Sequence, residues 1–342
     1  MNKEITLHNS SEFQNSTITD RFGRVFNYLR IAINERCNLR CIYCMPEEGI
    51  LFQEKDRLLD KNEICKIIKV MSELGVSKIR FTGGEPLLRK DLLDLIQYTY
   101  QQTDISSIHL TTNGVLLPKY INQLVKAGLN GINISLDTLN RVKFKKITRR
   151  EELENVLEGL DLAICSGIKS IKVNMVVMKG FNNDEITEFV ELTKNNDITV
   201  RFIELMPFDS HQIWKTGKFY RADHIVNDLR SHYRTLSPVT GSSTEYYIFK
   251  IKEYAGRVAV IPSYTRSLCS ACNRIRVTAD GNLLNCLYSR SETNMRDAIR
   301  NGMKNEGLKN LIVGSMQKKL KDGLIAQNHG NDLRDSMTQI GG

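Results

Sequence analysis

Short runs of alternating apolar and polar residues recur from Tyr28 onward, and each is followed by a longer stretch with apolar residues three and four apart. The first pattern is typical of a strand and the second of an amphipathic helix. Strands are expected at Tyr28–Ile33, Lys78–Gly83, Ser107–Asn113, Gly131–Asp137, Lys172–Val177 and Thr199–Leu205. Helices are expected at Lys61–Leu74, Asp91–Gln102, Lys119–Ala127, Arg150–Ser166 and Asp184–Lys194. Six βα units predict an α/β fold, either a partial (β/α)6 barrel or an open doubly wound sheet, and periodicity alone cannot separate the two.

Polar residues fall at every second position of the expected strands, so they share one face of each strand. They are Arg80 and Thr82; His109, Thr111 and Asn113; Asn133, Ser135 and Asp137; and Lys172 and Asn174. A sheet covered by helices on both faces would be apolar throughout, so one polar face predicts a lumen that holds a polar ligand. Arg30, Arg80 and Lys172 would make this lumen cationic. The alternative, a row of satisfied polar core residues, is less favoured because burying several unpaired cations costs much free energy.

The composition limits the class of protein. With 342 residues, six prolines and no low-complexity tract, the chain can bury a full core in one large domain or two. Eight cysteines without a signal-peptide pattern indicate a reducing, cytoplasmic setting, where thiols bind metals rather than form disulfides. No apolar run reaches transmembrane length. The formal charge of +9 favours an anionic ligand, either nucleic acid or a phosphorylated small molecule.

Three cysteines, Cys37, Cys41 and Cys44, stand within eight residues just after the first expected strand. Their thiolates can converge on one inorganic centre, because a bound metal offsets their mutual repulsion. Structural zinc takes four protein ligands, and no neighbouring His or Cys completes such a set here. An iron–sulfur cubane held by three cysteines instead keeps one iron open for a substrate or cofactor. The triplet therefore favours a cubane over zinc.

The segment Thr82-Gly-Gly-Glu-Pro86 closes the second expected strand. Its two glycines let the backbone pass close to a ligand, and Pro86 suits the start of the following helix. Taken alone, the segment is also compatible with a simple turn.

The βα rhythm stops past about Thr240, so a domain boundary is expected there. Beyond it lies a second odd triplet, made of Cys269, Cys272 and Cys286. A zinc ribbon needs two cysteine pairs, so a second cubane with an open iron is favoured. The other two cysteines, Cys65 and Cys165, stand in helical patterns and are interpreted as small buried hydrophobic residues.

Arg274 and Arg276 lie between the ligands of the second triplet, on one face of a short expected strand. Guanidinium groups bind phosphate through paired hydrogen bonds. Together with Arg30, Arg80 and Lys172 they outline a cationic site of triphosphate size. Two ordinary surface arginines are the alternative.

The cysteine spacing of the first triplet resembles the signature of the radical S-adenosylmethionine enzymes. Other segments resemble one family among them, the molybdenum cofactor biosynthesis protein A family of GTP 3',8-cyclases. They are Asp20-Arg-Phe-Gly-Arg24, Gly83-Gly-Glu-Pro86, the stretch from Leu268 to Gly281, and the terminal Gly341-Gly342. The resemblance covers nearly everything from Asp20 to the end. Asn34-Glu35 departs from the Thr-Asp pair usual before Arg36, at positions that hold no ligand.

The resemblance implies a lyase that cyclises GTP to (8S)-3',8-cyclo-7,8-dihydro-GTP, the first step of molybdenum cofactor biosynthesis. It implies S-adenosylmethionine and two [4Fe-4S] clusters as cofactors, one cluster held by each triplet. The residues implied for S-adenosylmethionine are Tyr43, Gly84, Ser135 and Met206. Those implied for GTP are Arg30, Arg80, Thr111, Lys172, Arg274 and Arg276. Those implied in catalysis are Arg30, Arg274, Arg276, Gly341 and Gly342, the two glycines as a tail that reaches the active site.

The resemblance also implies an organisation and partners. Residues 20–240 would form the partial barrel, 241–342 a second-cluster domain with the Gly-Gly tail, and 1–19 an extension without an assigned role. GTP, an external electron donor, a MoaC-type cyclic pyranopterin monophosphate synthase that uses the product, and a second copy in a homodimer are the expected partners. Neither nucleic acid nor a membrane is expected to bind.

Two other functions stay open at this point. A radical S-adenosylmethionine enzyme that modifies RNA would suit a basic chain with clusters, but no RNA-binding module is evident and the basic residues point into a lumen. A non-catalytic zinc scaffold would bind zinc tightly and leave S-adenosylmethionine intact. An iron count after anaerobic purification separates the scaffold from the enzymes.

Overall fold

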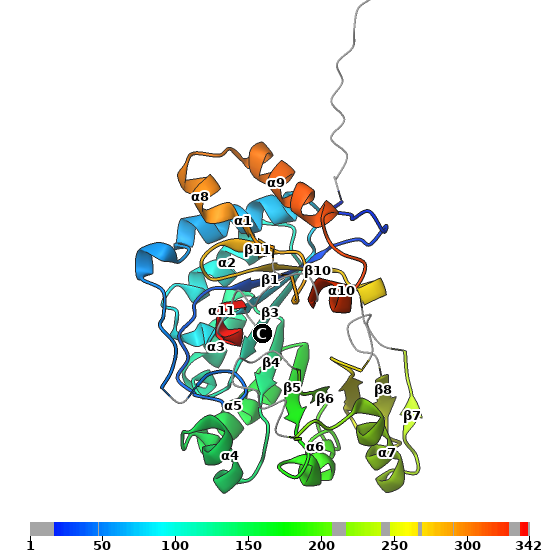
Figure 1. Cartoon of the computed structure of the whole chain (residues 1–342). Helices are drawn as coiled ribbons and strands as arrows, with labels where there is room; N and C mark the ends of the chain where they lie inside the picture. The colour runs from blue at the N-terminus through cyan, green and yellow to red at the C-terminus, as the bar shows by residue number, and fades with distance from the viewer. Residues whose placement is uncertain are drawn as a thin grey trace, which may run out of the picture.

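The computed structural model describes residues 17–46, 48–206, 217–240, 247–265, 269–289, 291–327 and 336–340. The strands of this part are β1 Tyr28–Ala32, β2 Lys78–Thr82, β3 Ser107–Thr112, β4 Gly131–Ser135, β5 Ser170–Val177, β6 Thr199–Glu204, β7 Ser237–Pro238, β8 Tyr247–Lys250, β9 Arg257–Ile261, β10 Arg274–Val277, β11 Asn282–Leu284 and β12 Thr293–Asn294. They form one sheet in the order β12-β11-β10-β1-β2-β3-β4-β5-β6-β9-β8-β7 (Figure 1).

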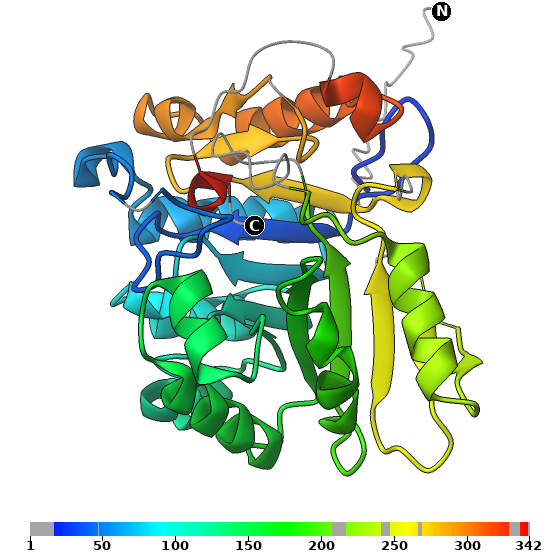
Figure 2. The same ribbon diagram turned by 60° about the horizontal axis from the view of Figure 1, so that its bottom comes forward.

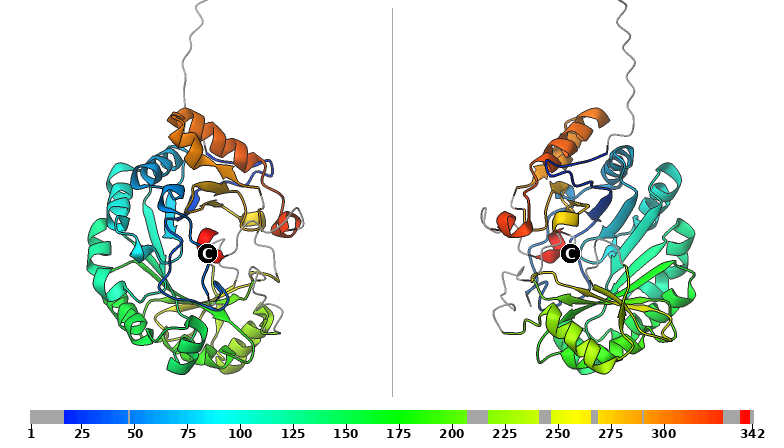
Figure 3. Two further views of the ribbon diagram at one scale, coloured as in Figure 1. Left: turned by 60° about the vertical axis from the view of Figure 1, so that its left-hand side comes forward. Right: turned by 90° about the vertical axis from the view of Figure 1, so that its right-hand side faces the viewer.

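Strands β1 to β6 lie side by side in chain order, and every neighbouring pair among them is parallel. A doubly wound sheet would reverse its order at a switch point, so this order excludes it. The sheet curves around a central space, with helices on its outer side (Figure 3). The predicted partial (β/α)6 barrel is therefore confirmed.

The helices of the described part, none of which is long and apolar enough to cross a membrane, mostly lie on the outer side of the curved sheet, but α11 (Met337–Ile340) lies within its curve and contacts β1 (Figure 3). They are α1 Lys61–Glu73, α2 Leu92–Gln102, α3 Leu117–Ala127, α4 Arg141–Thr148, α5 Leu153–Cys165, α6 Ile186–Glu191, α7 Ala222–His232, α8 Met295–Arg300, α9 Asn305–Gln317, α10 Gly323–Gln327 and α11 Met337–Ile340.

Helix α1 illustrates why these segments are helical. Asp60 and Glu63 form a capping box, in which each side chain accepts a hydrogen bond from the other residue's backbone N–H. Ile64 and Ile68 are fully buried on the face turned to the sheet. Gly75 follows with a φ of 82°, a conformation that suits glycine after a helix end.

The barrel wall continues past Thr240 on both of its sides. Strand β9 pairs in parallel with β6, and β10 pairs in parallel with β1. Figure 2 shows the blue β1 between the yellow β10 and the cyan-blue β2. One sheet thus crosses Thr240, and a domain boundary there stays a prediction. Periodicity missed β10 as part of the barrel because it has four residues and no helix before it.

Some local expectations were wrong. The helix expected over Asp184–Lys194 begins as a 3-10 turn and is α-helical only over α6. Helices α4, α7, α8, α9, α10 and α11 were not predicted, and α4 is short and rich in lysine. Cys165 is exposed rather than buried, because it is the last residue of α5 and faces solvent there. Cys65 packs partly buried against the core.

Candidate active site

A row of basic side chains crosses the lumen face of neighbouring strands. The register pairs Arg30 of β1 with Arg276 of β10 on one side and with Arg80 of β2 on the other. Paired residues of parallel strands point to the same face, so the three guanidinium groups lie next to one another. A second row, two residues earlier in each strand, consists of Arg274, Tyr28 and Lys78. We call Arg30, Arg80, Arg274 and Arg276 the cationic ladder.

The cationic ladder is largely buried, and its charges repel one another. Burial, followed by the charge of Arg276, holds the pKa of Arg30 well below its usual value. Burial raises the pKa of Tyr28, but Arg80 and Arg30 outweigh this effect, and the pKa falls to about 8. Within the described residues, Nε of Arg30 and Nε of Arg80 have no hydrogen-bond partner. Buried cations with open donors suit a polyanion such as a triphosphate.

The lumen face beyond the ladder carries further polar groups. Nη1 of Arg80 donates to Oγ1 of Thr111 over 3.5 Å, and Nε of Arg201 donates to Oδ1 of Asn174 over 2.8 Å. Asn133, whose amide oxygen can accept from both Arg80 and Arg201, pairs in register with Lys172. Thr111 and Lys172, two of the expected GTP contacts, therefore lie on the same face as the ladder.

Two lumen residues, Lys78 and Arg201, were not singled out in the sequence. Nζ of Lys78 lies 5.0 Å from the ring centroid of Tyr28, within the second row of the ladder. Arg201 follows Thr199 by two positions on β6, which is the same alternation that revealed Arg80. The signal was present in both strands, but an alternating lysine or arginine does not by itself distinguish a lumen from a solvated face.

The first cysteine triplet lies in the loop after β1. The N–H groups of Cys44 and Met45 both donate to the carbonyl oxygen of Cys41 over 2.9 Å, which winds the loop into a tight turn. Burial, and then the charge of Glu85, raises the pKa of Cys37 to about 11. Burial also raises the pKa of Cys41 above its usual value. Such thiols become thiolates when a metal supplies positive charge.

The first triplet supplies three thiol donors for a cluster. No three His, Cys, Asp or Glu side chains among the described residues are grouped closely enough to hold one ion. A cubane has a different requirement, because each of three thiolates binds a different iron. The three partly buried thiols after β1 form a suitable donor set.

Gly83 and Gly84 pack against the loop that leads to the first triplet. A Cβ atom at Gly83 would strike the carbonyl oxygen of Asn34, and one at Gly84 would strike that of Arg36. The N–H of Gly84 donates to the Asn34 carbonyl oxygen over 2.9 Å. Close contact between two chain segments thus requires both glycines, and contact of Gly84 with S-adenosylmethionine stays a prediction.

Glu85 fastens the same segment to the end of β3. Its carboxylate accepts from Oγ1 of Thr112 and from the N–H of Asn113, each over 2.8 Å. Burial raises the pKa of Glu85 to about 7, although these hydrogen bonds oppose the rise. Nδ2 of Asn113 in turn lies 3.6 Å from Sγ of Cys37. Glu85 therefore positions Asn113, whose side-chain amide lies next to Cys37 of the first triplet.

The other residues expected to hold S-adenosylmethionine are Tyr43 in the loop of the first triplet, Ser135 at the end of β4 and Met206 after β6. The Tyr43 hydroxyl donates to Oδ2 of Asp137 over 2.6 Å, and burial raises the pKa of Asp137 to about 6. Ser135 ends β4 and pairs in register with Asn174. Met206 follows β6 and lines the cavity of the second triplet. The carboxyl ends of barrel strands are where ligand sites of such folds gather.

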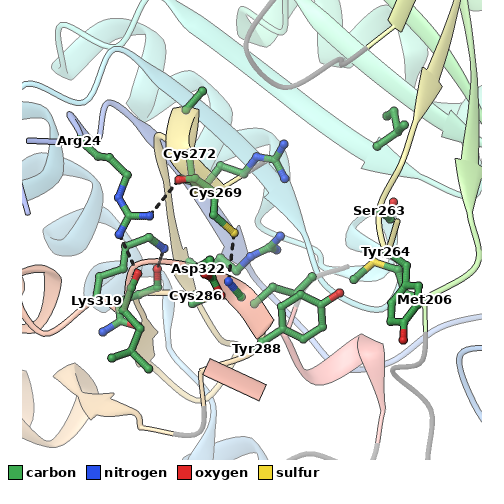
Figure 4. A pocket seen from close by; sticks show the side chains of 18 of the residues that line it. Arg24, Met206, Ser263, Tyr264, Cys269, Cys272, Cys286, Tyr288, Lys319 and Asp322 are labelled. Atoms are coloured by element: carbon green, nitrogen blue, oxygen red, sulfur yellow. Dashed lines mark hydrogen bonds between the residues drawn. The ribbon is translucent and has the colours of Figure 1, made fainter. Parts of the chain in front are cut away.

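The second triplet lines a cavity of about 190 Å³ (Figure 4). Its other walls include Arg24, Met206, Tyr264, Arg274, Arg276, Tyr288 and Lys319. The N–H of Gly323 donates to Sγ of Cys269 over 3.1 Å. Burial raises the pKa of Cys272, but Lys319 and the N–H of Arg274 outweigh it, so the pKa is lowered. Three thiols in one cavity beside positive charge suit a second cluster.

The two triplets lie at opposite ends of one strand pair. Strand β10 begins just after Cys272, whereas β1 ends shortly before Cys37. Because β1 and β10 are parallel neighbours, the first triplet is at the carboxyl end of the pair and the second at the amino end. The cationic ladder runs between them.

The end of the chain approaches the first triplet. Oγ of Ser336 donates to the carbonyl oxygen of Cys44 over 2.7 Å, and α11, which follows it, contacts β1. Thr338, Gln339 and Ile340 are buried. Gly341 and Gly342, expected in catalysis, lie outside the described residues.

Comparisons with known proteins identify the family of this chain. The Radical SAM superfamily model matches residues 31–193, and the Molybdenum Cofactor Synthesis C model matches residues 198–324. A GTP 3',8-cyclase of Chlorobaculum tepidum is 44% identical over 325 residues, which are 95% of this chain and 97% of that protein. The chain belongs to the GTP 3',8-cyclase family. The family member from Peptoclostridium acidaminophilum is 41% identical over 96% of this chain and 99% of its own.

A longer relative from an animal matches most of this chain. Molybdenum cofactor biosynthesis protein 1 of Bos taurus is 45% identical over 88% of this chain, which spans about half (48%) of that protein. Among solved structures, Streptococcus suis SuiB bound to S-adenosylmethionine covers 84% of this chain and 68% of its own, with a TM-score of 0.56 and 16% identity. A further SuiB structure reaches a TM-score of 0.59, covering 89% of this chain and 72% of its own at 16% identity. At this identity the likeness shows the fold alone.

Proposed function

We propose that this chain converts GTP to (8S)-3',8-cyclo-7,8-dihydro-GTP with S-adenosylmethionine as the radical source, the first step of molybdenum cofactor biosynthesis. Its place in the GTP 3',8-cyclase family supports the proposal. The observation in the structure that carries it is the cationic ladder between two cysteine triplets. The ladder provides a buried site for a triphosphate next to a place for radical chemistry.

Membership in the radical S-adenosylmethionine superfamily indicates an iron–sulfur cluster and S-adenosylmethionine as cofactors. When bound, they supply a carbon-centred radical that can take the 3'-hydrogen of the GTP ribose. In our proposal the chain holds two clusters. Cys37, Cys41 and Cys44 would hold the one that meets S-adenosylmethionine, and Cys269, Cys272 and Cys286 would hold one that faces the guanine.

The side chains around these cofactors bind and orient. Arg30, Arg80, Arg274 and Arg276, with Thr111 and Lys172, would bind the triphosphate, fix the ribose and keep bulk water out of the lumen. Tyr43, Gly84, Ser135 and Met206 would hold S-adenosylmethionine against the first cluster. The partly buried Tyr43–Asp137 hydrogen bond supports this role, since it fixes the loop beside Cys44.

The tail and the partners complete the proposal. Gly341 and Gly342 would enter the lumen, which the burial of Thr338, Gln339 and Ile340 and the hydrogen bond from Ser336 to Cys44 support. An external electron donor, a cyclic pyranopterin monophosphate synthase that takes the product, a homodimeric state, and a division into residues 1–19, 20–240 and 241–342 belong to the same proposal. They rest on the family likeness.

The direct test is anaerobic incubation of the purified protein with GTP and S-adenosylmethionine, with product mass and 5'-deoxyadenosine as readouts. We expect about eight irons per chain, because each cubane contains four. Cys41→Ser should abolish cleavage of S-adenosylmethionine. Cys272→Ser should spare some cleavage but lose GTP cyclisation, since it affects only the second triplet.

Several outcomes would contradict this function. Zinc in place of iron would favour a scaffold, and about four irons per chain would leave the second triplet without its cluster. Equal loss of both reactions in Cys272→Ser would reject the division of roles between the triplets. Cleavage of S-adenosylmethionine that depends on RNA rather than on GTP would show that GTP is not the substrate.

A further inference from the structure

Lys319 is a buried lysine in the wall of the second-triplet cavity. It is 3% exposed and lines the same cavity as Cys269, Cys272 and Cys286. Nζ donates to the carbonyl oxygen of Asn285 and lies 5.5 Å from the ring centroid of Phe26. In the part of the chain that the structure describes, no carboxylate forms an ion pair with it. A buried ammonium without a counter-charge lowers stability, so this placement needs an explanation.

The neighbouring Arg24 shows what a compensated cation looks like in the same wall. Its guanidinium forms an ion pair of 2.6 Å with the fully buried carboxylate of Asp20. It also donates to the carbonyl oxygens of Cys269, Leu320 and Lys321. Arg24 therefore braces the loop of the second triplet with its charge offset by Asp20, whereas among the described residues no carboxylate forms an ion pair with Lys319.

The surroundings of Lys319 hold its ammonium group beside the thiols. Asn285, whose carbonyl oxygen receives Nζ, immediately precedes Cys286, and its side-chain amide donates to the carbonyl oxygen of Ser315 over 3.1 Å. Figure 4 draws the cysteines between Lys319 on one side and Tyr264 and Met206 on the other. The hydrogen bond to Asn285 thus holds the ammonium group of Lys319 at the cavity wall, beside the three cysteines.

We propose that Lys319 is the counter-charge of the cluster held by Cys269, Cys272 and Cys286, and that it sets the reduction potential of that cluster. The proposal rests on the second cluster of the proposed function. Three thiolates leave a cubane negatively charged, and each one-electron reduction by an external donor adds one more negative charge. A fixed positive charge in a low-dielectric wall stabilises the reduced form more than the oxidised form.

The ladder arginines near Cys272 do not replace this role. Arg274 and Arg276 line the same cavity, but they also belong to the cationic ladder, where the phosphates of the substrate would take up their charge in the proposed function. Lys319 is bound to a backbone carbonyl, which is neutral, so its charge acts on the cluster whether substrate is present or not. Lys319 is therefore a positioning and tuning residue rather than a group that reacts.

The test compares Lys319→Met, Lys319→Arg and Lys318→Met, because Lys318 is the exposed neighbour. The variants are made in a background with Cys37, Cys41 and Cys44 changed to Ser, so that only the second cluster is titrated. Reduction is followed by electron paramagnetic resonance in an anaerobic redox titration. We expect Lys319→Met to disfavour reduction at least about tenfold, a downward shift of about 59 mV for one electron. Lys319→Arg and Lys318→Met should keep the potential of the parent.

Iron content and thermal unfolding complete the test. Loss of iron from Lys319→Met, with iron retained in Lys319→Arg and Lys318→Met, also supports the counter-charge. In cluster-free protein Lys319→Met should unfold at the same or a higher temperature, because it removes an uncompensated charge. An unchanged potential, an equal shift in the Met and Arg variants, or earlier unfolding of cluster-free Lys319→Met would overturn the proposal. A parent protein that binds no iron at the second triplet would instead overturn the two-cluster function.

Discussion

At the scale of single residues, Arg276 shows why strand register matters more than charge count. Burial, and then the neighbouring Arg274, lowers the pKa of Arg276 to about 10, so the side chain stays charged at neutral pH. It is 4% exposed and lies beside Arg30. Cations held together in this way are stabilised by a bound polyanion, and GTP binding should depend strongly on each of them.

The double variant Arg274→Ala plus Arg276→Ala should therefore weaken GTP binding. Each lost charged contact is worth about 1.5–3 kcal/mol, or roughly 10- to 150-fold in Kd. Equilibrium binding of GTP by calorimetry measures the effect. Arg230→Ala, an exposed arginine near the end of helix α7, is the matched control and should bind like the parent. An unchanged Kd in the double variant would move the phosphate site away from the ladder.

At the scale of elements, the contact between β3 and β4 depends on a large side chain on one strand and a glycine on the other. His109 pairs in register with Gly131, and a Cβ atom at Gly131 would collide with the imidazole. Burial, followed by Lys78 and Arg80, lowers the pKa of His109 to about 2, so the ring is neutral. The imidazole thus fills the lumen face next to the ladder without adding a charge.

Gly131→Ala should lower the free energy of unfolding by about 1–3 kcal/mol, because it overpacks this contact. In a His109→Ala background, Gly131→Ala should lower the free energy of unfolding by less. A double-mutant cycle from urea unfolding measures the coupling free energy between the two positions. Gly314→Ala in α9, where a Cβ atom meets nothing, is the control and should be neutral or stabilising. An equal cost of Gly131→Ala with and without His109 would show that the ring is not the obstacle.

The pattern along the chain predicted the first six strands to within two residues at each end, and it predicted four of the helices on the outer face. These elements repeat one unit, so their periodicity is strong. The sequence did not predict β10 as a barrel strand for two reasons. Its four residues are too few to show a periodic pattern, and its partner β1 lies near the other end of the chain. Short helices such as α4 escaped for the first of these reasons.

The candidate site divides in the same way. Cysteine spacing and paired arginines are local signals, so both triplets and the ladder could be named from the sequence. Lys319 and Glu85 could not, because the role of each depends on what surrounds it. Lys319 follows α9 and meets a carbonyl beside Cys286, while Glu85 reaches residues at the end of β3.

At the scale of the whole molecule, the chain end returns to the loop of the first triplet. Removal of Gly341 and Gly342 should abolish cyclisation, while iron content and cleavage of S-adenosylmethionine stay at the level of the parent, because no cluster ligand is lost. Product mass and 5'-deoxyadenosine yield distinguish the two reactions. Ser336→Ala keeps the glycines but removes the anchor on Cys44, and it should lower cyclisation only in part. Full cyclisation by the shortened chain would contradict the proposed role of Gly341 and Gly342.

The pairing of β1 with β10 has a consequence for how the protein is made. Asn27 and Asn273, which precede these strands, share a hydrogen bond of 2.9 Å although they are 246 residues apart. At about 5–20 residues per second, a ribosome needs on the order of 10–50 s to add the second after the first. During that time one edge of β1 has no partner strand, and unpaired edges recruit foreign strands. The nascent barrel therefore has a defined period of vulnerability, which ends when β10 emerges.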